Sequence, residues 1–140
     1  MPELNEDLWP SDLGFASIVT PAAILRAQAA LLAEKTKGML EAAVETSSVG
    51  NEIYHRFVIK VPALGNYRYV LFKVHHPMEL YPVVVDKDAT RSRLMPFAPP
   101  IPIEDMRLKD EEALRLWLRG VFASNATKRI IANLYAQASG

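Results

Sequence analysis

The stretch NEIYHRFVIKVPALGNYRYVLFKVHH, residues 51–76, predicts two long antiparallel strands joined by a short turn. Side chains alternate between the two faces of a strand, so a period of two residues sorts each strand into faces. Pro62 and Gly65 punctuate a loop of about four residues, which is a common hairpin length. We therefore expect this hairpin to be the centre of the fold.

The alternation gives the hairpin one apolar face and one amphipathic face. The expected apolar face carries Ile53, His55, Phe57, Ile59, Val61, Val70, Phe72 and Val74. The expected outward face carries Glu52, Tyr54, Arg56, Val58, Lys60, Tyr67, Tyr69, Leu71, Lys73 and His75. Because β-branched and aromatic residues fit a pleated, half-buried surface, we expect the first face to cover the core.

Flanking segments extend the hairpin into a larger sheet. Residues 39–46 continue the alternation, with Glu41 and Glu45 on the outward face. Residues 80–86 form a short apolar strand, and Pro82 places its start or an edge there because proline donates no ladder hydrogen bond. The sequence therefore predicts a four-stranded antiparallel β-meander with one core face.

Helices are expected both before and after the strands in the sequence. Thr20 and Pro21 give the capping hydroxyl and first-position proline of a helix over residues 21–37. Apolar residues at helical spacing predict a helix over residues 110–122 and a second one that begins at Ser124 or Asn125. The fold class is therefore α+β, with the helices packed mainly on the apolar face of the sheet.

The chain of 140 residues fits a single domain, 1–140. Residues 1–19 are expected to form an N-terminal arm that packs through its apolar side chains, Trp9 among them, although Trp9 could instead be presented to a partner. Residues 87–103 hold a cluster of prolines and predict a stiff connector that lies along the body.

The amino-acid composition argues against several classes of function. The 16 basic and 16 acidic residues cancel, so no global field attracts nucleic acid or an anionic membrane. There is no cysteine, which removes disulfides and thiolate chemistry. The N-terminus lacks the pattern of a signal peptide, and no apolar run approaches the length of a membrane helix. We expect a cytoplasmic protein without a membrane association.

Compact catalytic motifs are absent from the sequence. It contains no Gly-x-Ser-x-Gly, Walker, dinucleotide-binding or HExxH pattern. These absences weaken the common enzyme classes without excluding an active site assembled from distant residues. We predict no cofactor and no small-molecule substrate.

The histidines are the remaining catalytic lead. His55 falls on the expected apolar face, and His76 joins it if the second strand continues that far, whereas His75 points the other way. A zinc site needs a third ligand, for which Asp86 and Glu79 are the only nearby candidates. A pair of partly buried, hydrogen-bonded histidines is the simpler interpretation, so no metal is predicted.

The outward face is the expected binding surface. Tyrosine, aliphatic and arginine side chains are typical of protein interfaces. The residues expected to form this surface are Tyr54, Arg56, Tyr69, Leu71 and Lys73. The competing interpretation is a solvated sheet face on which Glu41 or Glu45 pairs with cations across the strands.

The sequence thus favours a non-catalytic binding protein that acts through the outward face of its sheet, by self-association as a homodimer or with a protein partner. One alternative is a hydrolase or nuclease built around His55, His76 and a carboxylate such as Asp86, so whether the chain is an enzyme stays open. A second alternative is a module for single-stranded nucleic acid, because aromatic rings with basic flanks stack on bases.

Overall fold

The computed structural model of the chain describes residues 4–13, 18–86 and 106–140. Within these residues, five antiparallel strands form one sheet in the order β1-β2-β3-β4-β5. The strands are β1 Glu41–Val49, β2 Glu52–Val61, β3 Tyr67–Pro77, β4 Val83–Val85 and β5 Met106–Leu108. The helices are α1 Pro21–Lys35, α3 Glu111–Ala123 and α4 Asn125–Ser139, and a 3-10 turn, η2 Pro62–Leu64, joins β2 to β3. The expected connector, 87–103, lies outside the described residues.

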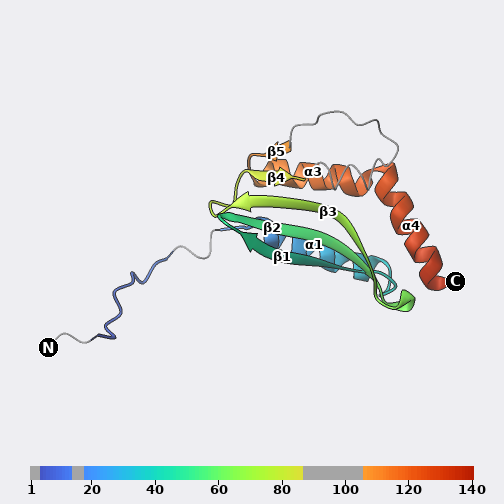
Figure 1. The fold of residues 1–140 in the computed structure, drawn as a ribbon, viewed down its shortest axis with the longest axis horizontal. Helices are drawn as coiled ribbons and strands as arrows, with labels where there is room; N and C mark the ends of the chain where they lie inside the picture. The colour runs from blue at the N-terminus through green and yellow to red at the C-terminus, as the bar shows by residue number, and fades with distance from the viewer. Residues whose placement is uncertain (1–3, 14–17, 87–105) are drawn as a thin grey trace.

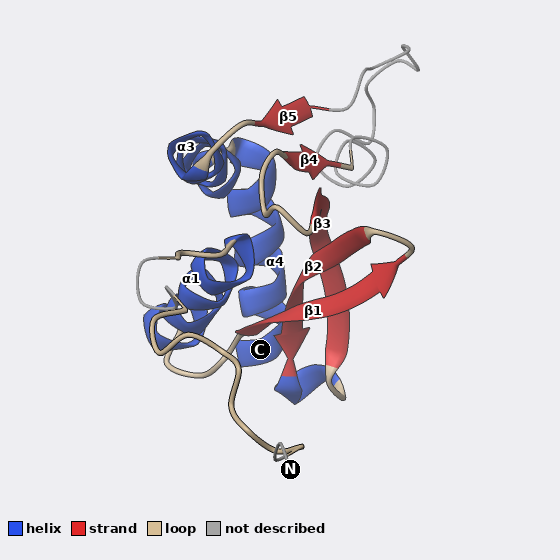
Figure 2. Ribbon diagram, turned by 90° about the vertical axis from the view of Figure 1, so that its left-hand side faces the viewer, coloured by secondary structure: helices blue, strands red, loops and turns tan. Residues whose placement is uncertain are grey.

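The helices of the described residues lie on one side of the sheet, as Figure 2 shows, and none of them covers its other face. This confirms the predicted α+β class. The sheet has five strands and not the four predicted, because Leu108 of β5 pairs with Val83 of β4. A three-residue strand carries too little alternation to be recognised in the sequence. No helix within the described residues is long and apolar enough to cross a bilayer.

The boundaries of α1 follow from local chemistry. The Thr20 hydroxyl accepts a hydrogen bond from the Ala23 amide at 3.0 Å, and Pro21 occupies the first helical position. The helix ends at Lys35, after which Gly38 adopts a φ of 81° and donates its amide to the Ala33 carbonyl at 2.8 Å. Glycine reaches this left-handed conformation without strain and so returns the chain towards β1.

The two C-terminal helices are joined by a single residue, Ser124. Its hydroxyl accepts a hydrogen bond from the Thr127 amide at 3.2 Å and thereby caps α4. The extended backbone of Ser124 turns the chain sharply, and α4 leaves α3 at a steep angle in Figure 1. So short a link predicts an antiparallel or a steeply crossed pair, and the structure has the steep crossing, which brings α4 over the η2 end of the central hairpin.

The core lies between the sheet and the helices. Phe57 and Phe72 stack with ring centroids 5.1 Å apart, and Trp117 of α3 meets the Phe72 ring edge-on at 4.9 Å. Offset and edge-on aromatic pairs are favourable beyond the apolar area that they bury. Phe57 and Phe72 therefore face the helices, as the alternation of the hairpin predicts.

A β-bulge changes the faces of the first half of β3, between the hairpin turn and Leu71. Phe57 pairs with Phe72, but the next residue, Val58, pairs with Val70, so Leu71 is an extra residue in β3. Leu71 consequently lies in the core with only 1% of its surface exposed. Tyr69 is half-buried and packs against the same core. The prediction that Leu71 and Tyr69 belong to the outward face is therefore wrong.

The N-terminal arm does not pack as predicted. Trp9 is 76% exposed, and residues 4–13 lead away from the body in Figure 1. The Asp7 carboxylate accepts a hydrogen bond from the Trp9 amide at 3.0 Å, which forms a local turn within the arm. The arm therefore presents its largest side chain to the solvent.

Candidate binding groove and buried histidine pair

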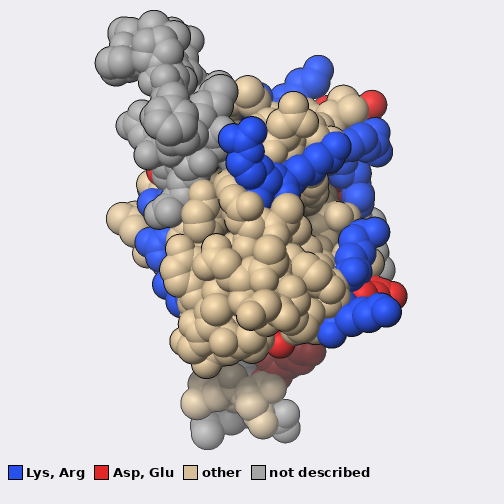
Figure 3. Space-filling view, turned by 90° about the vertical axis from the view of Figure 1, so that its right-hand side faces the viewer, with Lys and Arg blue, Asp and Glu red and all other residues tan. Residues whose placement is uncertain are grey.

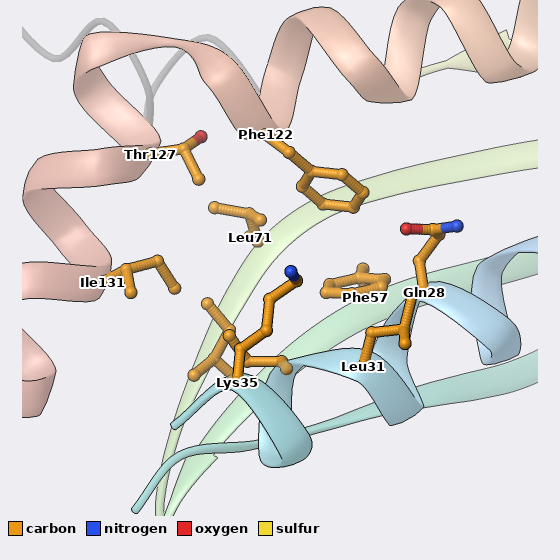
Figure 4. A pocket seen from close by; sticks show the side chains of 10 residues that line it. Gln28, Leu31, Lys35, Phe57, Leu71, Phe122, Thr127 and Ile131 are labelled. Carbon is orange, nitrogen blue, oxygen red and sulfur yellow. The ribbon is translucent and has the colours of Figure 1, made fainter. Parts of the chain in front are cut away.

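A cavity of about 330 Å³ opens between α1, the helix-covered face of the sheet and the start of α4. Pockets of this size are within the range that accommodates ligand groups. Figure 4 shows its apolar walls, to which α1 contributes Leu31, β2 contributes Phe57 and α4 contributes Ile131. Leu71, which the bulge turns inward, lies at the base of the same cavity.

Few polar groups reach this cavity. Figure 4 shows the Lys35 side chain rising from the end of α1 towards the space between the apolar walls. Gln28 lies on the same stripe of α1, and Thr127 of α4 is buried with its hydroxyl bonded to the Ser124 hydroxyl at 3.0 Å. The cavity is thus an apolar site with one cation and one amide available to a ligand.

Two further hollows extend the cavity along the helices. One of about 390 Å³ lies between α1 and α3 and shares Phe122 and Gln28 with the first. The other, of about 430 Å³, lies along α4 and shares Phe122 and Ile131. Phe122 borders all three hollows, and we call them together the helix-side groove.

The rim of the helix-side groove is basic. Lys35, Arg115, Arg119 and Lys128 line its three parts. Among the described residues, Arg115 pairs with Glu111 at 3.2 Å, whereas the other three cations have no ion pair. Figure 3 shows the side of the molecule that carries α4, where a broad uncharged area is bordered mainly by Lys and Arg. The groove therefore suits an apolar group that carries negative charge beside it.

The two histidines predicted as possible neighbours do come together. His55 of β2 and His76 of β3 are each 2% exposed, with 2.9 Å between their Nε2 atoms. His55 Nδ1 lies 2.9 Å from the Thr46 hydroxyl, and His76 Nδ1 lies 2.7 Å from the Pro77 carbonyl oxygen. Every ring nitrogen of the pair therefore has a hydrogen-bond partner.

These partners fix the tautomers of the neutral pair. A carbonyl oxygen only accepts, so His76 Nδ1 carries the proton and His76 Nε2 is an acceptor. His55 Nε2 must then donate to His76, and His55 Nδ1 accepts from the Thr46 hydroxyl. The result is a continuous chain of hydrogen bonds from Thr46 to Pro77 with no unsatisfied ring nitrogen.

The electrostatics keep His55 neutral. Its burial is the largest cause that lowers the pKa, and the charges of His76 and Arg26 lower it further, from 6.5 to about 4. At neutral pH the His55 ring therefore carries no charge. A neutral, fully bonded imidazole under the helical layer stabilises one arrangement of β1, β2 and β3.

The structure does not bring Asp86 to this pair. The Asp86 amide donates to the Lys73 carbonyl at 2.9 Å, so Asp86 is aligned with Lys73 and not with His76. Among the residues that the structure describes, no group of three or more His, Cys, Asp or Glu side chains could hold a metal ion. The acid-base site predicted from His55, His76 and Asp86 is thus not assembled in this part of the chain.

Of the five residues predicted to form a binding surface on the outward face of the sheet, three lie on that face. Tyr54, Arg56 and Lys73 lie on it, and Arg56 is exposed. The Lys73 ammonium lies 4.9 Å from the centroid of the Tyr54 ring, and the His75 ring lies 4.8 Å from it on a tilted plane. Much of this face is therefore engaged in contacts of its own.

Sequence reasoning missed the helix-side groove. The spacing of Ile24, Leu25, Leu31 and Leu32 predicts a single core stripe of α1, but in the structure Leu31 is exposed and forms a wall of the groove. A usable signal was present, because Gln28, Leu31 and Lys35 recur at helical spacing and place polar groups on the same stripe as leucine. Comparisons with models of known protein families, with curated proteins and with solved structures each find no match.

Proposed function

We propose that this protein is a non-catalytic interaction protein that binds an apolar, acidic polypeptide segment in its helix-side groove. The observation that carries the proposal is the open cavity of about 330 Å³, whose walls are formed by side chains from α1, the sheet and α4. An apolar surface that remains open between packed elements is a common site of partner binding.

The shape of the groove favours a polypeptide over a compact small molecule. Its three hollows meet at Phe122 and are lined by α1, α3 and α4. A peptide can place successive apolar side chains into such adjoining hollows, as amphipathic segments do in hydrophobic grooves. Lys35, Arg119 and Lys128 at the rim favour acidic residues beside the apolar anchors.

The outward face of the sheet offers less for a partner. Leu71 and Tyr69 are directed to the helical side, which removes two of the five residues proposed for that surface. An ion pair between Arg68 and Glu45 and the contacts of Tyr54 with Lys73 already use several of the remaining polar groups. A partner on this face would have to displace contacts that the sheet makes with itself.

A catalytic role of the histidine pair is less well supported than binding. Both rings are buried, and each nitrogen has a protein partner. A general base must reach the proton that it abstracts from a substrate. The pair therefore has the features of a structural hydrogen-bond network.

Fluorescence polarisation with labelled peptides tests the proposal. The set contains peptides with tryptophan and leucine anchors between acidic residues, the same anchors between lysines, and acidic peptides without anchors. We expect only the first group to bind, with an affinity that falls at least about tenfold, or ~1.4 kcal/mol, in Leu31→Glu and Ile131→Glu.

Arg56→Glu on the outward face is the matched control and should leave the affinity unchanged. Loss of binding in Arg56→Glu but not in the groove variants would assign the partner to the outward face. Equal binding of the acidic peptides with and without anchors would contradict the proposal. So would the absence of binding by every anchored peptide.

A further inference from the structure

The N-terminal arm has the composition of a ligand for the groove. Residues 4–13 read LNEDLWPSDL, and Leu8 and Trp9 are 84% and 76% exposed. Two adjacent large apolar side chains in water are unfavourable unless something covers them. The arm therefore carries apolar anchors that this copy of the chain leaves uncovered.

The charge of the arm is complementary to the rim of the groove. The first Lys or Arg of the chain is Arg26, and the residues before it include Glu6 and Asp7 beside the two anchors. The rim presents Lys35, Arg119 and Lys128. Opposite charges around an apolar contact fix its register and speed the encounter of the two surfaces.

The turn at the anchors also lowers the cost of docking. The hydrogen bond from the Trp9 amide to the Asp7 carboxylate restricts the backbone around Leu8, and Pro10 fixes the next φ angle. A segment that is restricted before binding loses less conformational entropy when it docks. The backbone that carries the two anchors is thus partly restricted before it docks.

The direction of the arm favours docking in the groove of another molecule over docking in its own. The arm joins α1 at its first residue, Pro21, and leads away from the body on the side opposite α4 in Figure 1. The main cavity instead lies beside Leu31 and Lys35 in the last turns of α1, next to α4. The arm of one copy thus extends away from its own groove and is free to meet that of a neighbour.

We propose that the arm of one chain docks in the helix-side groove of a second copy, with Trp9 and Leu8 as the apolar anchors and Glu6 and Asp7 beside the basic rim. This inference rests on the proposed function, since it names the segment that the groove binds. Reciprocal exchange of two arms fills both grooves and closes a symmetric dimer.

Light scattering of the full chain over a range of concentrations measures the assembly. We expect the mass to rise from 15.6 kDa to twice that value, and the dimer dissociation constant to increase at least about tenfold in Trp9→Ala. Ile131→Glu and the exposed charge reversal Lys35→Glu should weaken the dimer as well. Arg56→Glu is the control and should leave it intact.

Mixing two defective chains separates exchange between copies from docking within one copy. Trp9→Ala keeps an intact groove, and Ile131→Glu keeps an intact arm. Each should be monomeric alone, while the mixture should form a one-to-one complex. A mixture that stays monomeric, or a wild-type monomer in which the Trp9 fluorescence is blue-shifted, would overturn exchange between copies.

The peptides used for the proposed function keep the two ideas distinguishable. If anchored acidic peptides bind Trp9→Ala, but the wild-type chain stays monomeric with Trp9 in water, the groove function stands and the arm proposal fails. If neither the peptides nor the arm bind, both fail. A dimer that Arg56→Glu abolishes and Trp9→Ala leaves intact would also overturn the arm proposal.

Discussion

His55 Nε2 donates a hydrogen bond to His76 Nε2 at 2.9 Å, beneath the helical layer and within the central hairpin. The Pro77 carbonyl fixes the tautomer of His76 and the Thr46 hydroxyl completes the bonds of His55, so the neutral His55 ring is fully hydrogen-bonded. A proton added to His55 has to replace the hydrogen bond that His55 Nδ1 accepts. This arrangement links the protonation of one histidine to the stability of the fold.

The first prediction concerns the pH dependence of unfolding. Burial, His76 and Arg26 lower the pKa of His55 from 6.5 to about 4. As the pH falls below about 6.5, the unfolded chain takes up a proton at this residue and the folded chain does not, so the free energy of unfolding decreases. The loss should be complete near pH 4 and amount to about 3 kcal/mol, which urea unfolding at several pH values measures.

His55→Gln is the comparison for this prediction, since glutamine does not titrate. The difference in free energy of unfolding between the wild type and His55→Gln should shrink as the pH is lowered from about 7 to about 4. An identical pH dependence in both proteins would show that His55 titrates normally in the folded state.

The neighbouring positions of His55 and His76 could be predicted from the sequence, but their bond could not. Alternation alone assigns both residues to the same face of the hairpin. Contact between them depends on the register, which pairs His55 with Val74 and His76 with Ile53. Register is set by the turn and by the packing of the whole face, and these are not properties of one strand.

The bulge at Leu71 could not be predicted from the alternation of side chains along β3. A single extra residue in β3 reverses the faces of the residues between the bulge and the turn, so the alternation that is correct for Phe72 is wrong for Tyr69. Nothing in the local sequence distinguishes Leu71 from its neighbours as the unpaired residue. The groove was missed for a related reason, because side chains from α1, the sheet and α4 meet there only after the helices have packed.

The second prediction tests the inward position of Leu71. Leu71→Ala should lower the free energy of unfolding by about 2–5 kcal/mol, because it removes a buried side chain from the core. Val70→Ala is the control at the adjacent position, which lies on the outward face opposite Val58 and is half-buried. Chemical unfolding should show the smaller loss for Val70→Ala, and the reverse order would place Leu71 on the outward face.

The third prediction concerns Val58, which is 0% exposed although it lies on the outward face of the sheet, which none of the described helices covers. On that face, Ala43 of β1 and Val70 of β3 flank it. The register also places Val58 between Arg68 and Glu45, whose ion pair spans β2 from β3 to β1 and covers it. Val58→Ala should therefore cost about 2 kcal/mol, as in a core, while Val49→Ala at an exposed position of β1 should cost almost nothing.

Removal of the ion pair separates its own contribution from that of the valine. Arg68→Ala should lower the free energy of unfolding by less than about 1 kcal/mol, since both charged side chains are partly exposed. A double-mutant cycle of Arg68→Ala with Val58→Ala should reveal coupling, because the arginine side chain covers the valine. Strict additivity of the two losses would show that Val58 is buried by other groups.

The last prediction concerns the capping residues that set the two C-terminal helices. The Asp110 carboxylate accepts a hydrogen bond from the Ala113 amide at 2.8 Å, and the Ser124 hydroxyl accepts one from the Thr127 amide. Each substitution by alanine should cost about 1 kcal/mol, which urea unfolding measures against the exposed control Lys109→Ala. Only Ser124→Ala should also weaken peptide binding in the groove, because it alters the start of α4, where Thr127 and Ile131 form one wall. Equal peptide affinity in Asp110→Ala and Ser124→Ala would show that the groove does not depend on how α4 begins.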